Sequence, residues 1–280
     1  MSNSFAKSFN HQYANTFSHV SAFARAMQYQ SAGAHNNTKL CDWAIIGLPF
    51  DVATTNRPGA RFGPTALRQA SSQLESLPAF PYHIDPFKYL RVLDYGDLNF
   101  NIGHPQNFVN QSSEALYEII KNGTKPFSLG GDHFITYPVL KALYKKHGMI
   151  SLIHFDAHQD TWPDDGQELN HGTMFERAAN EGIIDAKSSI QIGIRTSCPN
   201  RHHFNILYAH QIHQMKIREV VNKIIATVGR YPVYLTFDID CLDPAFAPGT
   251  GTPVCGGLSS AQTLSILNGI KDIELIGADL

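Results

Sequence analysis

Residues 149–160 read MISLIHFDAHQD, an apolar run that ends in two aspartates and a histidine at alternate positions. The run is continuous rather than alternating, which is typical of a parallel strand that is buried on both faces. An extended backbone sends every second side chain to the same side, so Asp156, His158 and Asp160 can converge on one point. This stretch therefore predicts a buried strand that delivers three polar side chains at its carboxyl end.

Apolar runs of the same kind recur along the chain, and patterns typical of helices stand between them. Pro64 lies near the start of one helical pattern, where its missing N–H is harmless, and Gly123 follows another at a position where helices commonly end. Either Ser259 or Ser260 can cap the last helix. We expect strands over residues 43–50, 89–98, 125–131, 149–158, 188–196, 231–240 and 273–280, and helices over residues 63–76, 107–123, 136–148, 218–229 and 260–270.

The alternation of strand and helix predicts an α/β fold in which helices cover a mostly parallel sheet. No internal repeat, linker or change of composition divides residues 41–280, so we expect one domain there. Residues 1–40 are rich in polar and aromatic side chains and are expected to form an N-terminal extension.

The composition narrows the class of protein. The chain has 280 residues, 43% of them hydrophobic and 16% charged. Its net charge is −2, and the sequence contains no basic cluster that would indicate a nucleic-acid partner. No run approaches the ~18 apolar residues of a membrane span, and the N-terminus lacks the apolar segment of a signal peptide. The cysteines form no C-x-x-C pair, which favours a reducing cytoplasm over a disulfide framework. They are Cys41, Cys198, Cys241 and Cys255.

Acidic residues and histidines follow three of the expected strands at the point where each strand ends. In open α/β sheets, ligands bind outside the carboxyl ends of the strands, so these side chains are expected to share one edge of the sheet. They are Asp132, His133, Asp156, His158, Asp160, Asp238, Asp240 and Asp243.

So many carboxylates cannot be ionised together near a low-dielectric core without a compensating charge. Few basic residues lie nearby in the sequence, so we expect a divalent metal, and more than one. Oxygen ligands with two imidazoles suit Mn²⁺ better than Mg²⁺, Zn²⁺, Fe²⁺ or Ni²⁺, and they differ from the thiolates of a structural zinc site. The alternative is a strand end whose aspartates only stabilise a turn. It is disfavoured because three strand ends share the pattern.

The stretch GTGTPVCGGLS (249–259) follows the third acidic cluster closely, and five of its eleven residues are Gly or Pro. These residues break regular structure, so we expect a shaped loop. The functional interpretation is a wall of an active-site cleft, and the alternative is a long surface turn. HGTMF (171–175) contributes one further histidine, which is a weak signal alone.

These segments resemble the signatures of the ureohydrolases, the family that includes arginase and agmatinase, across almost the whole chain. They occur in the order typical of the family, and their amino-acid sequences are closer to those of bacterial agmatinases than to those of arginases. DVATTNRPGARFGPTALRQ (51–69) resembles the family's loop on the substrate side. The other matching segments are GGDHFITYP (130–138), HFDAHQDT (154–161), HGTMF (171–175), QIGIRT (191–196) and TFDIDCLDPAFAPGTGTPVCGGL (236–258).

The resemblance implies an arginase-like, three-layer αβα fold and a site for two Mn²⁺ ions per subunit. Family members hydrolyse a guanidinium group to an amine and urea by attack of a hydroxide that bridges the metals. By resemblance, one metal is held by His133, Asp156, Asp160 and Asp238, and the other by Asp156, His158, Asp238 and Asp240.

The resemblance also implies roles for individual residues. Asp160 would pass a proton to the leaving amine, His171 would shuttle protons or contact the substrate, and Asn170 would tune that histidine. Arg57 and its loop would shape the pocket for the substrate tail. The family assembles as trimers and hexamers, so a homo-oligomer is implied.

Several functions stay open at this point. The leading hypothesis is a cytoplasmic agmatinase that makes putrescine and urea in polyamine biosynthesis, and guanidinobutyrase or another amidinohydrolase is the runner-up. Arginase is disfavoured because no residues for an α-amino acid head group can be located. A zinc deacetylase of related fold is a further alternative. The family pattern continues after Leu280 with a glutamate that pairs with the substrate guanidinium. The sequence stops before it, so we expect either a shortened chain or an impaired, inactive metal-binding homologue.

Overall fold

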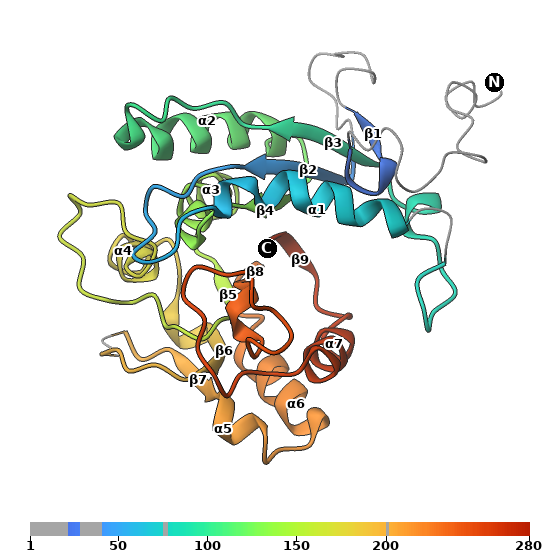
Figure 1. The fold of residues 1–280 in the computed structure, drawn as a ribbon, viewed down its shortest axis with the longest axis vertical. Coiled ribbons are helices and arrows are strands. Elements are labelled where there is room, and N and C mark those ends of the chain that lie inside the picture. Colours follow the sequence, from blue (N-terminus) through green and yellow to red (C-terminus); the bar gives the residue numbers. More distant parts are fainter. Residues whose placement is uncertain (1–21, 29–40, 75–77, 200–201) are drawn as a thin grey trace.

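The computed structural model describes residues 22–28, 41–74, 78–199 and 202–280, and most of the expected extension over residues 1–40 lies outside them. The described residues form one sheet of nine strands in the order β1-β3-β2-β4-β9-β8-β5-β6-β7, and all neighbouring strands run parallel (Figure 1). The strands are β1 (Met27–Gln28), β2 (Trp43–Leu48), β3 (Val92–Asp97), β4 (Lys125–Gly130), β5 (Ser151–Phe155), β6 (Ile190–Ile194), β7 (Asn205–Tyr208), β8 (Val233–Phe237) and β9 (Leu275–Asp279).

Helices fill most of the connections between these strands. The α-helices among the described residues are α1 (Gly63–Ser71), α2 (Phe108–Ile120), α3 (Thr136–His147), α4 (Met174–Asn180), α5 (Ala209–Ile212), α6 (Ile217–Thr227) and α7 (Ser260–Gly269). Short 3₁₀ helices span Phe23–Arg25, Ala60–Phe62, Ser72–Leu74, Pro86–Lys88, Pro105–Asn107, His133–Ile135, Ala186–Ser188 and Ile239–Cys241. None of the described helices combines the length and the apolar character that crossing a bilayer requires.

Side chains along the central strands alternate between two apolar clusters, which shows that the sheet is covered on both faces. On β5, Leu152 packs in the cluster that contains α2, α3 and α4, whereas Ile153 and Phe155 pack with α6 and α7. On β8, Tyr234 and Val233 divide in the same way. Figure 1 shows the two helix groups apart from each other, α2 with α3 and α6 with α7. The predicted three-layer α/β fold with a parallel sheet is therefore confirmed.

The predicted strands and helices all occur, although their ends differ by a few residues. Ser259 is the residue that caps α7, because its hydroxyl accepts a hydrogen bond from the backbone N–H of Gln262. The structure adds β1, β7, α4 and α5, which the sequence patterns did not indicate. All four are short, so they carry too few residues for a recognisable period.

The glycine pair Gly130-Gly131, at the end of β4, allows the chain to turn toward the edge where the predicted ligands gather. A Cβ atom on Gly131 would lie 2.4 Å from the carbonyl oxygen of Phe50 and 2.6 Å from that of Leu48, so only glycine fits there. The next residue, Asp132, caps the short helix His133–Ile135 by accepting a hydrogen bond from the backbone N–H of Phe134. This local structure fixes where His133 lies.

Candidate metal centre

Three strand ends supply the predicted metal ligands. Asp156 and Asp238 each follow directly after β5 and β8, which are neighbours in the sheet. His133 lies three residues after the end of β4, and only β9 separates β4 from β8. The six predicted ligands gather at this edge, and each lies close to at least one other member of the set, as the two groups below show.

The first group surrounds the ring of His133. Its Nδ1 atom lies 2.9 Å from Oδ2 of Asp156 and 3.1 Å from Oδ2 of Asp160. The same nitrogen lies 3.4 Å from Oδ2 of Asp238. The side chains of His133 and Asp156 are almost fully buried, so the site is set into the protein rather than displayed on its surface.

The second group surrounds the ring of His158. Its Nδ1 atom lies 3.2 Å from Oδ1 of Asp156 and 3.1 Å from Oδ2 of Asp240. Asp156 therefore contributes one carboxylate oxygen to each group. Two ligand groups that share a carboxylate are suited to two cations held close together.

Backbone hydrogen bonds hold these carboxylates in place. Asp238 accepts from the backbone N–H of Asp240 at 2.9 Å, and Asp240 accepts from the backbone N–H of Ala157 at 3.0 Å, which ties the end of β8 to the end of β5. Asp160 has a φ of 52°, in the left-handed region that aspartate seldom adopts. A residue held in such a conformation is commonly part of a functional site, because its surroundings have to impose it.

The hydrogen-bonding state of His133 tests whether a cation fits. Thr236 donates its hydroxyl to Asp279 at 2.7 Å, so the contact of 2.8 Å between Thr236 Oγ1 and His133 Nε2 has the ring nitrogen as donor. That assignment leaves Nδ1 with a lone pair directed at carboxylate oxygens. Nδ1 is buried and makes no hydrogen bond with any described residue. A lone pair facing anionic oxygens is repulsive unless a cation or a proton lies between them, so these residues fit a divalent metal.

The pKa shifts at the site arise from burial and from the charges of neighbouring side chains. Burial raises the pKa of Asp238 well above its usual range, and the carboxylates of Asp240 and Asp156 raise it further. Burial, followed by the charge of Asp156, raises the pKa of Asp240 to about 6. Burial would lower the pKa of His158, but its hydrogen bonds to Asp156 and Asp240 raise it to about 11. Without a cation, Asp238 and Asp240 resist ionisation beside Asp156, and the proton held by His158 supplies part of the positive charge that these carboxylates need.

A further imidazole lies among these groups, although the sequence patterns did not single it out. His154 stands on β5, and its Nε2 atom lies 2.9 Å from Oδ2 of Asp156. It therefore meets the geometric criterion for a possible ligand of the first group. The sequence places it inside an apolar run, where a histidine carries no sign of its function.

His171, the predicted catalytic histidine, is held by the loop that follows β2. The backbone N–H of Thr55 donates to Nε2 of His171 at 3.2 Å, and the hydroxyl of Thr55 lies 2.8 Å from the same nitrogen. Burial lowers the pKa of His171, while the charge of Asp160 acts in the opposite direction. The net shift keeps the ring neutral at neutral pH, with Nε2 as an acceptor.

The loop over residues 249–259 lies next to one of the predicted metal ligands. Thr252 donates its hydroxyl to Oδ2 of Asp240 at 3.2 Å. The side chain of Asn56 and the backbone N–H of Arg57 both donate to the carbonyl of Gly251, at 3.0 Å and 3.4 Å. The two loops predicted to surround the substrate therefore touch each other. Arg57 itself is exposed.

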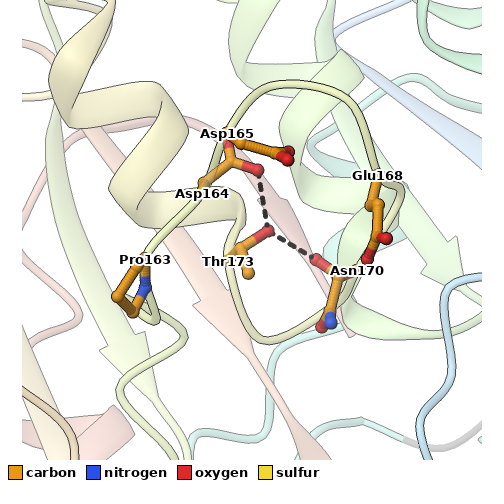
Figure 2. A pocket seen from close by; sticks show the side chains of 6 residues that line it. All are labelled: Pro163, Asp164, Asp165, Glu168, Asn170 and Thr173. Atoms are coloured by element: carbon orange, nitrogen blue, oxygen red, sulfur yellow. Dashed lines mark hydrogen bonds between the residues drawn. The ribbon is translucent and has the colours of Figure 1, made fainter.

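A cavity of about 340 Å³ lies in the segment between Asp160 and α4 (Figure 2). Thr173 links its two sides, because its single hydroxyl hydrogen is shared between Asp164 at 3.4 Å and the carbonyl of Asn170 at 3.2 Å, as the dashed lines in Figure 2 show. Arg177 neutralises Asp164 through two hydrogen bonds of 2.7 Å. Asn170 lines this cavity and directly precedes His171. The full lining is Pro163, Asp164, Asp165, Glu168, Asn170 and Thr173, which includes none of the predicted metal ligands.

Comparison with known proteins gives one family. Residues 41–280 match the model of the Arginase family. An agmatinase of Neisseria meningitidis serogroup C is 50% identical over 240 residues, which is 85% of this chain and 78% of the relative. An agmatinase of Chromobacterium violaceum is 44% identical over 260 residues, which is 92% of this chain and 81% of the relative.

Solved structures give the same result. A hypothetical agmatinase from Burkholderia thailandensis superposes with a TM-score of 0.89 at 48% identity, and the match covers 95% of this chain and 82% of that one. Proclavaminate amidino hydrolase from Streptomyces clavuligerus superposes with a TM-score of 0.87 at 32% identity, covering 95% of this chain and 89% of that one.

Proposed function

This chain belongs to the arginase family, and from that premise we propose that it hydrolyses agmatine to putrescine and urea. The resemblance that the motifs predicted is confirmed by the match over residues 41–280 and by relatives that are agmatinases. The chain is a ureohydrolase that acts on C–N bonds. The structural observation that carries the proposal is the position of Asp156, which contributes one oxygen to each of two adjoining ligand groups.

We assign the two ligand groups to two Mn²⁺ ions, as the family resemblance implies. When bound, two divalent cations supply a water molecule of lowered pKa and a positive field for the charge that develops during reaction. The carboxylate-rich composition of the groups favours Mn²⁺ over softer metals. In this assignment His133, Asp156, Asp160 and Asp238 hold one ion, and Asp156, His158, Asp238 and Asp240 hold the other.

The protein side chains then have to bind the guanidinium and move protons. A guanidinium carbon is a poor electrophile, so the cleft loops have to hold it in the orientation in which water can add to it. We assign Asp160 to take the proton released as water adds to that carbon and to return it to the nitrogen that leaves as the amine. His171 is neutral at pH 7 and faces the loop at Thr55, which suits exchange of protons with the substrate or solvent.

Three further proposals follow from the resemblance. Residues 41–280 are the catalytic domain, which is the range that the family match spans. The protein acts in the cytoplasm, and it assembles as a homotrimer or homohexamer. The mass of the purified protein in solution, measured by light scattering after gel filtration, tests the assembly.

The experiment that tests the function is a substrate panel. The protein is incubated with Mn²⁺ and with agmatine, 4-guanidinobutyrate or arginine, and urea release is measured. We expect agmatine to give the highest kcat/KM. Parallel reactions with Mg²⁺ and Zn²⁺ identify the metal that supports turnover.

Each outcome of the panel has a distinct meaning. Preference for 4-guanidinobutyrate would replace the proposed substrate by a carboxylate-bearing one. Release of urea only with Zn²⁺ would overturn the manganese assignment. Tight binding of two metal ions with no urea from any substrate would indicate an inactive metal-binding homologue.

A further inference from the structure

The third imidazole beside the metal candidates, His154, has a role that its position alone leaves open. It satisfies the distance criterion for a metal ligand, yet it also lies within hydrogen-bonding distance of Asp156. We infer that His154 is a positioning residue: its Nε2–H donates to Asp156 and fixes that carboxylate, and His154 does not bind the metal. The inference rests on the proposed function, because it concerns how the carboxylate shared by the two ligand groups is oriented.

The ring of His154 is locked in a buried position. Only 1% of the residue is exposed, and the adjoining Gln191 is not exposed at all. β5 and β6 pair in a register that sets His154 opposite Gln191. Phe175 packs against the ring with a centroid distance of 4.6 Å and also contacts the ring of His133 at 5.5 Å. The ring therefore has little freedom to rotate toward other partners.

Gln191 decides which nitrogen of His154 carries the proton. Its amide nitrogen donates to the backbone carbonyl of Gln159 at 2.7 Å and lies 3.2 Å from Nδ1 of His154. A primary amide has two N–H hydrogens, and here there are two acceptors for them. Nδ1 of His154 is thus the acceptor, so in the neutral ring the proton resides on Nε2. That proton is directed at Oδ2 of Asp156, 2.9 Å away.

The carbonyl of Gln159 disfavours the other tautomer of His154, in which the proton is on Nδ1. If His154 were to bind a metal through Nε2, its proton would have to move to Nδ1, where it would face the N–H of Gln191. Relief of that clash requires the amide to turn over, which would place its oxygen against the carbonyl oxygen of Gln159. The atom at the other amide position, Oε1, makes no hydrogen bond with any described residue, so turning the amide gains no partner there. Buried polar groups are costly to leave in such repulsive contacts.

This assignment leaves Asp156 with the right number of free lone pairs. A carboxylate offers about four acceptor sites, two on each oxygen. Oδ2 accepts from His154, and Oδ1 accepts from the backbone N–H of His158 at 2.6 Å. One site then remains on each oxygen, as a carboxylate shared between two cations needs. Outer hydrogen-bond partners of this kind orient metal ligands in many proteins.

The first experiment reads the tautomer of His154 directly. The full chain is labelled with ¹⁵N-histidine, and two-bond ¹H–¹⁵N spectra are recorded without metal and with the diamagnetic ion Zn²⁺. The His154→Gln variant identifies the signals of His154 by their loss. We expect His154 to retain the Nε2–H pattern in both states, while the nitrogen signals of His133 and His158 move when Zn²⁺ binds. Loss of the proton from Nε2 of His154 upon addition of Zn²⁺ would overturn the inference.

The second experiment measures Mn²⁺ affinity by competition with a chelator. The amide nitrogen of a glutamine reaches the position of Nε2 in histidine, so His154→Gln keeps a donor for Asp156, whereas His154→Leu removes it. We expect His154→Leu to weaken Mn²⁺ binding by roughly 10- to 100-fold, the range seen for outer hydrogen-bond partners of metal ligands. His154→Gln should recover most of that loss. His210→Gln, at an exposed histidine of α5, is the matched control and should leave the affinity unchanged.

These readouts separate the inference from the proposed function. Neither depends on turnover, and the tautomer of the wild-type protein can be read whether or not the leucine variant folds. If the substrate panel yields no urea while His154 keeps its Nε2–H, the function is wrong and the positioning role stands. If both substitutions of His154 abolish binding of one of two Mn²⁺ ions to the same extent, His154 is a ligand and the inference is wrong.

Discussion

The guanidinium of Arg195 donates a hydrogen bond of 2.6 Å from Nη2 to the backbone carbonyl of Asp240. The same nitrogen donates to the carbonyl of Val254 at 2.6 Å, so one side chain joins the segment after β8 to the loop over residues 249–259. Its other acceptors are also backbone oxygens, namely those of Gly193, Cys241, Leu242 and Cys255. Arg195 lies just after β6, and it fixes the backbone that presents the predicted ligand Asp240.

Replacement of Arg195 is expected to destabilise this part of the fold. Arg195→Met keeps much of the side-chain volume but leaves several carbonyls without a donor, each worth about 1–3 kcal/mol where water cannot replace it. Because the site is partly exposed, we expect the free energy of unfolding to fall by about 2–4 kcal/mol, as measured by chemical denaturation. Arg195→Lys should recover only part of the loss, since an ammonium group cannot span the acceptors as a guanidinium does. An unchanged denaturation midpoint would show that the contacts are dispensable.

The carboxylate of Asp238 is expected to have opposite effects on metal binding and on the stability of the metal-free protein. Asp238→Asn removes a proposed shared ligand, so Mn²⁺ affinity and urea release should fall by at least ~100-fold, beyond the range for outer partners of a ligand. In the presence of a chelator, the variant should melt at the same temperature as the wild type or higher, because one of the crowded carboxylates is gone. Asp272→Asn, at an exposed site, is the control. Normal metal affinity in Asp238→Asn would refute the ligand assignment.

Much of the fold and of the candidate site could be predicted because both follow from local patterns. The continuous apolar runs predict strands buried on both faces, and the run before Asp156 is indeed β5, which is fully buried and lies between β8 and β6 in the sheet. Asp156 and His158 do reach the same edge, but not through the extended backbone that the spacing of two predicted: β5 ends at Phe155, the chain bends at residues 157–158, and the backbone N–H of His158 donates to Asp156.

Other features depend on the order of the strands and could not be predicted. β9 lies between β4 and β8, and no local pattern encodes that order. The contact between His154 and Gln191 arises from the register of β5 with β6, which is set by the whole sheet. Arg195 binds backbone carbonyls, and these carry no signature in a sequence. A single histidine or arginine thus gains its role only from elements that are distant along the chain.

Metal binding is expected to release protons. The pKa of His158 is raised to about 11 in the metal-free protein, because Asp156 and Asp240 outweigh the effect of burial, so the ring is protonated at pH 7.5. Its contribution to the stability of the metal-free fold is complete below the unfolded pKa of about 6.5 and is lost as the pH rises toward 11. A metal ligand has to be deprotonated, so Mn²⁺ affinity should rise about tenfold per pH unit for each proton released.

Calorimetry in two buffers of different ionisation enthalpy counts those protons. We expect at least one proton to be released per protein at pH 7.5. Titrations at pH 6.5 and 8.5 should show a higher Mn²⁺ affinity at pH 8.5. An affinity that stays constant over this range, with heats that do not depend on the buffer, would contradict the assignment of His158 as a ligand.

The hydroxyl of Thr55 is expected to affect turnover but not metal binding. It lies 2.8 Å from Nε2 of His171, and a hydrogen bond of this kind contributes about 0.5–1.5 kcal/mol. Thr55→Val keeps the shape and the backbone N–H but loses the hydroxyl, so kcat should fall by roughly 2- to 12-fold. Thr55→Ser should retain most of the activity, and chelator competition should give the same Mn²⁺ affinity for all three proteins. Wild-type turnover in Thr55→Val would show that the hydroxyl does not position His171.

His171 is also expected to make the metal-free protein less stable in acid. Burial lowers its pKa, with Asp160 opposing the shift, so the unfolded chain binds a proton more readily than the folded one. Its stabilising contribution is therefore complete above the unfolded pKa of about 6.5, and it is lost as the pH falls from there through the lower folded pKa. His171→Gln replaces the ring by a neutral amide that cannot take up this proton. Between pH 7 and pH 5 the free energy of unfolding should thus fall less steeply in the variant, by up to about 1.4 kcal/mol per pH unit. Chemical denaturation in the presence of a chelator measures both slopes, with His210→Gln as the exposed control, and equal slopes for wild type and His171→Gln would mean that the folded pKa is not lowered.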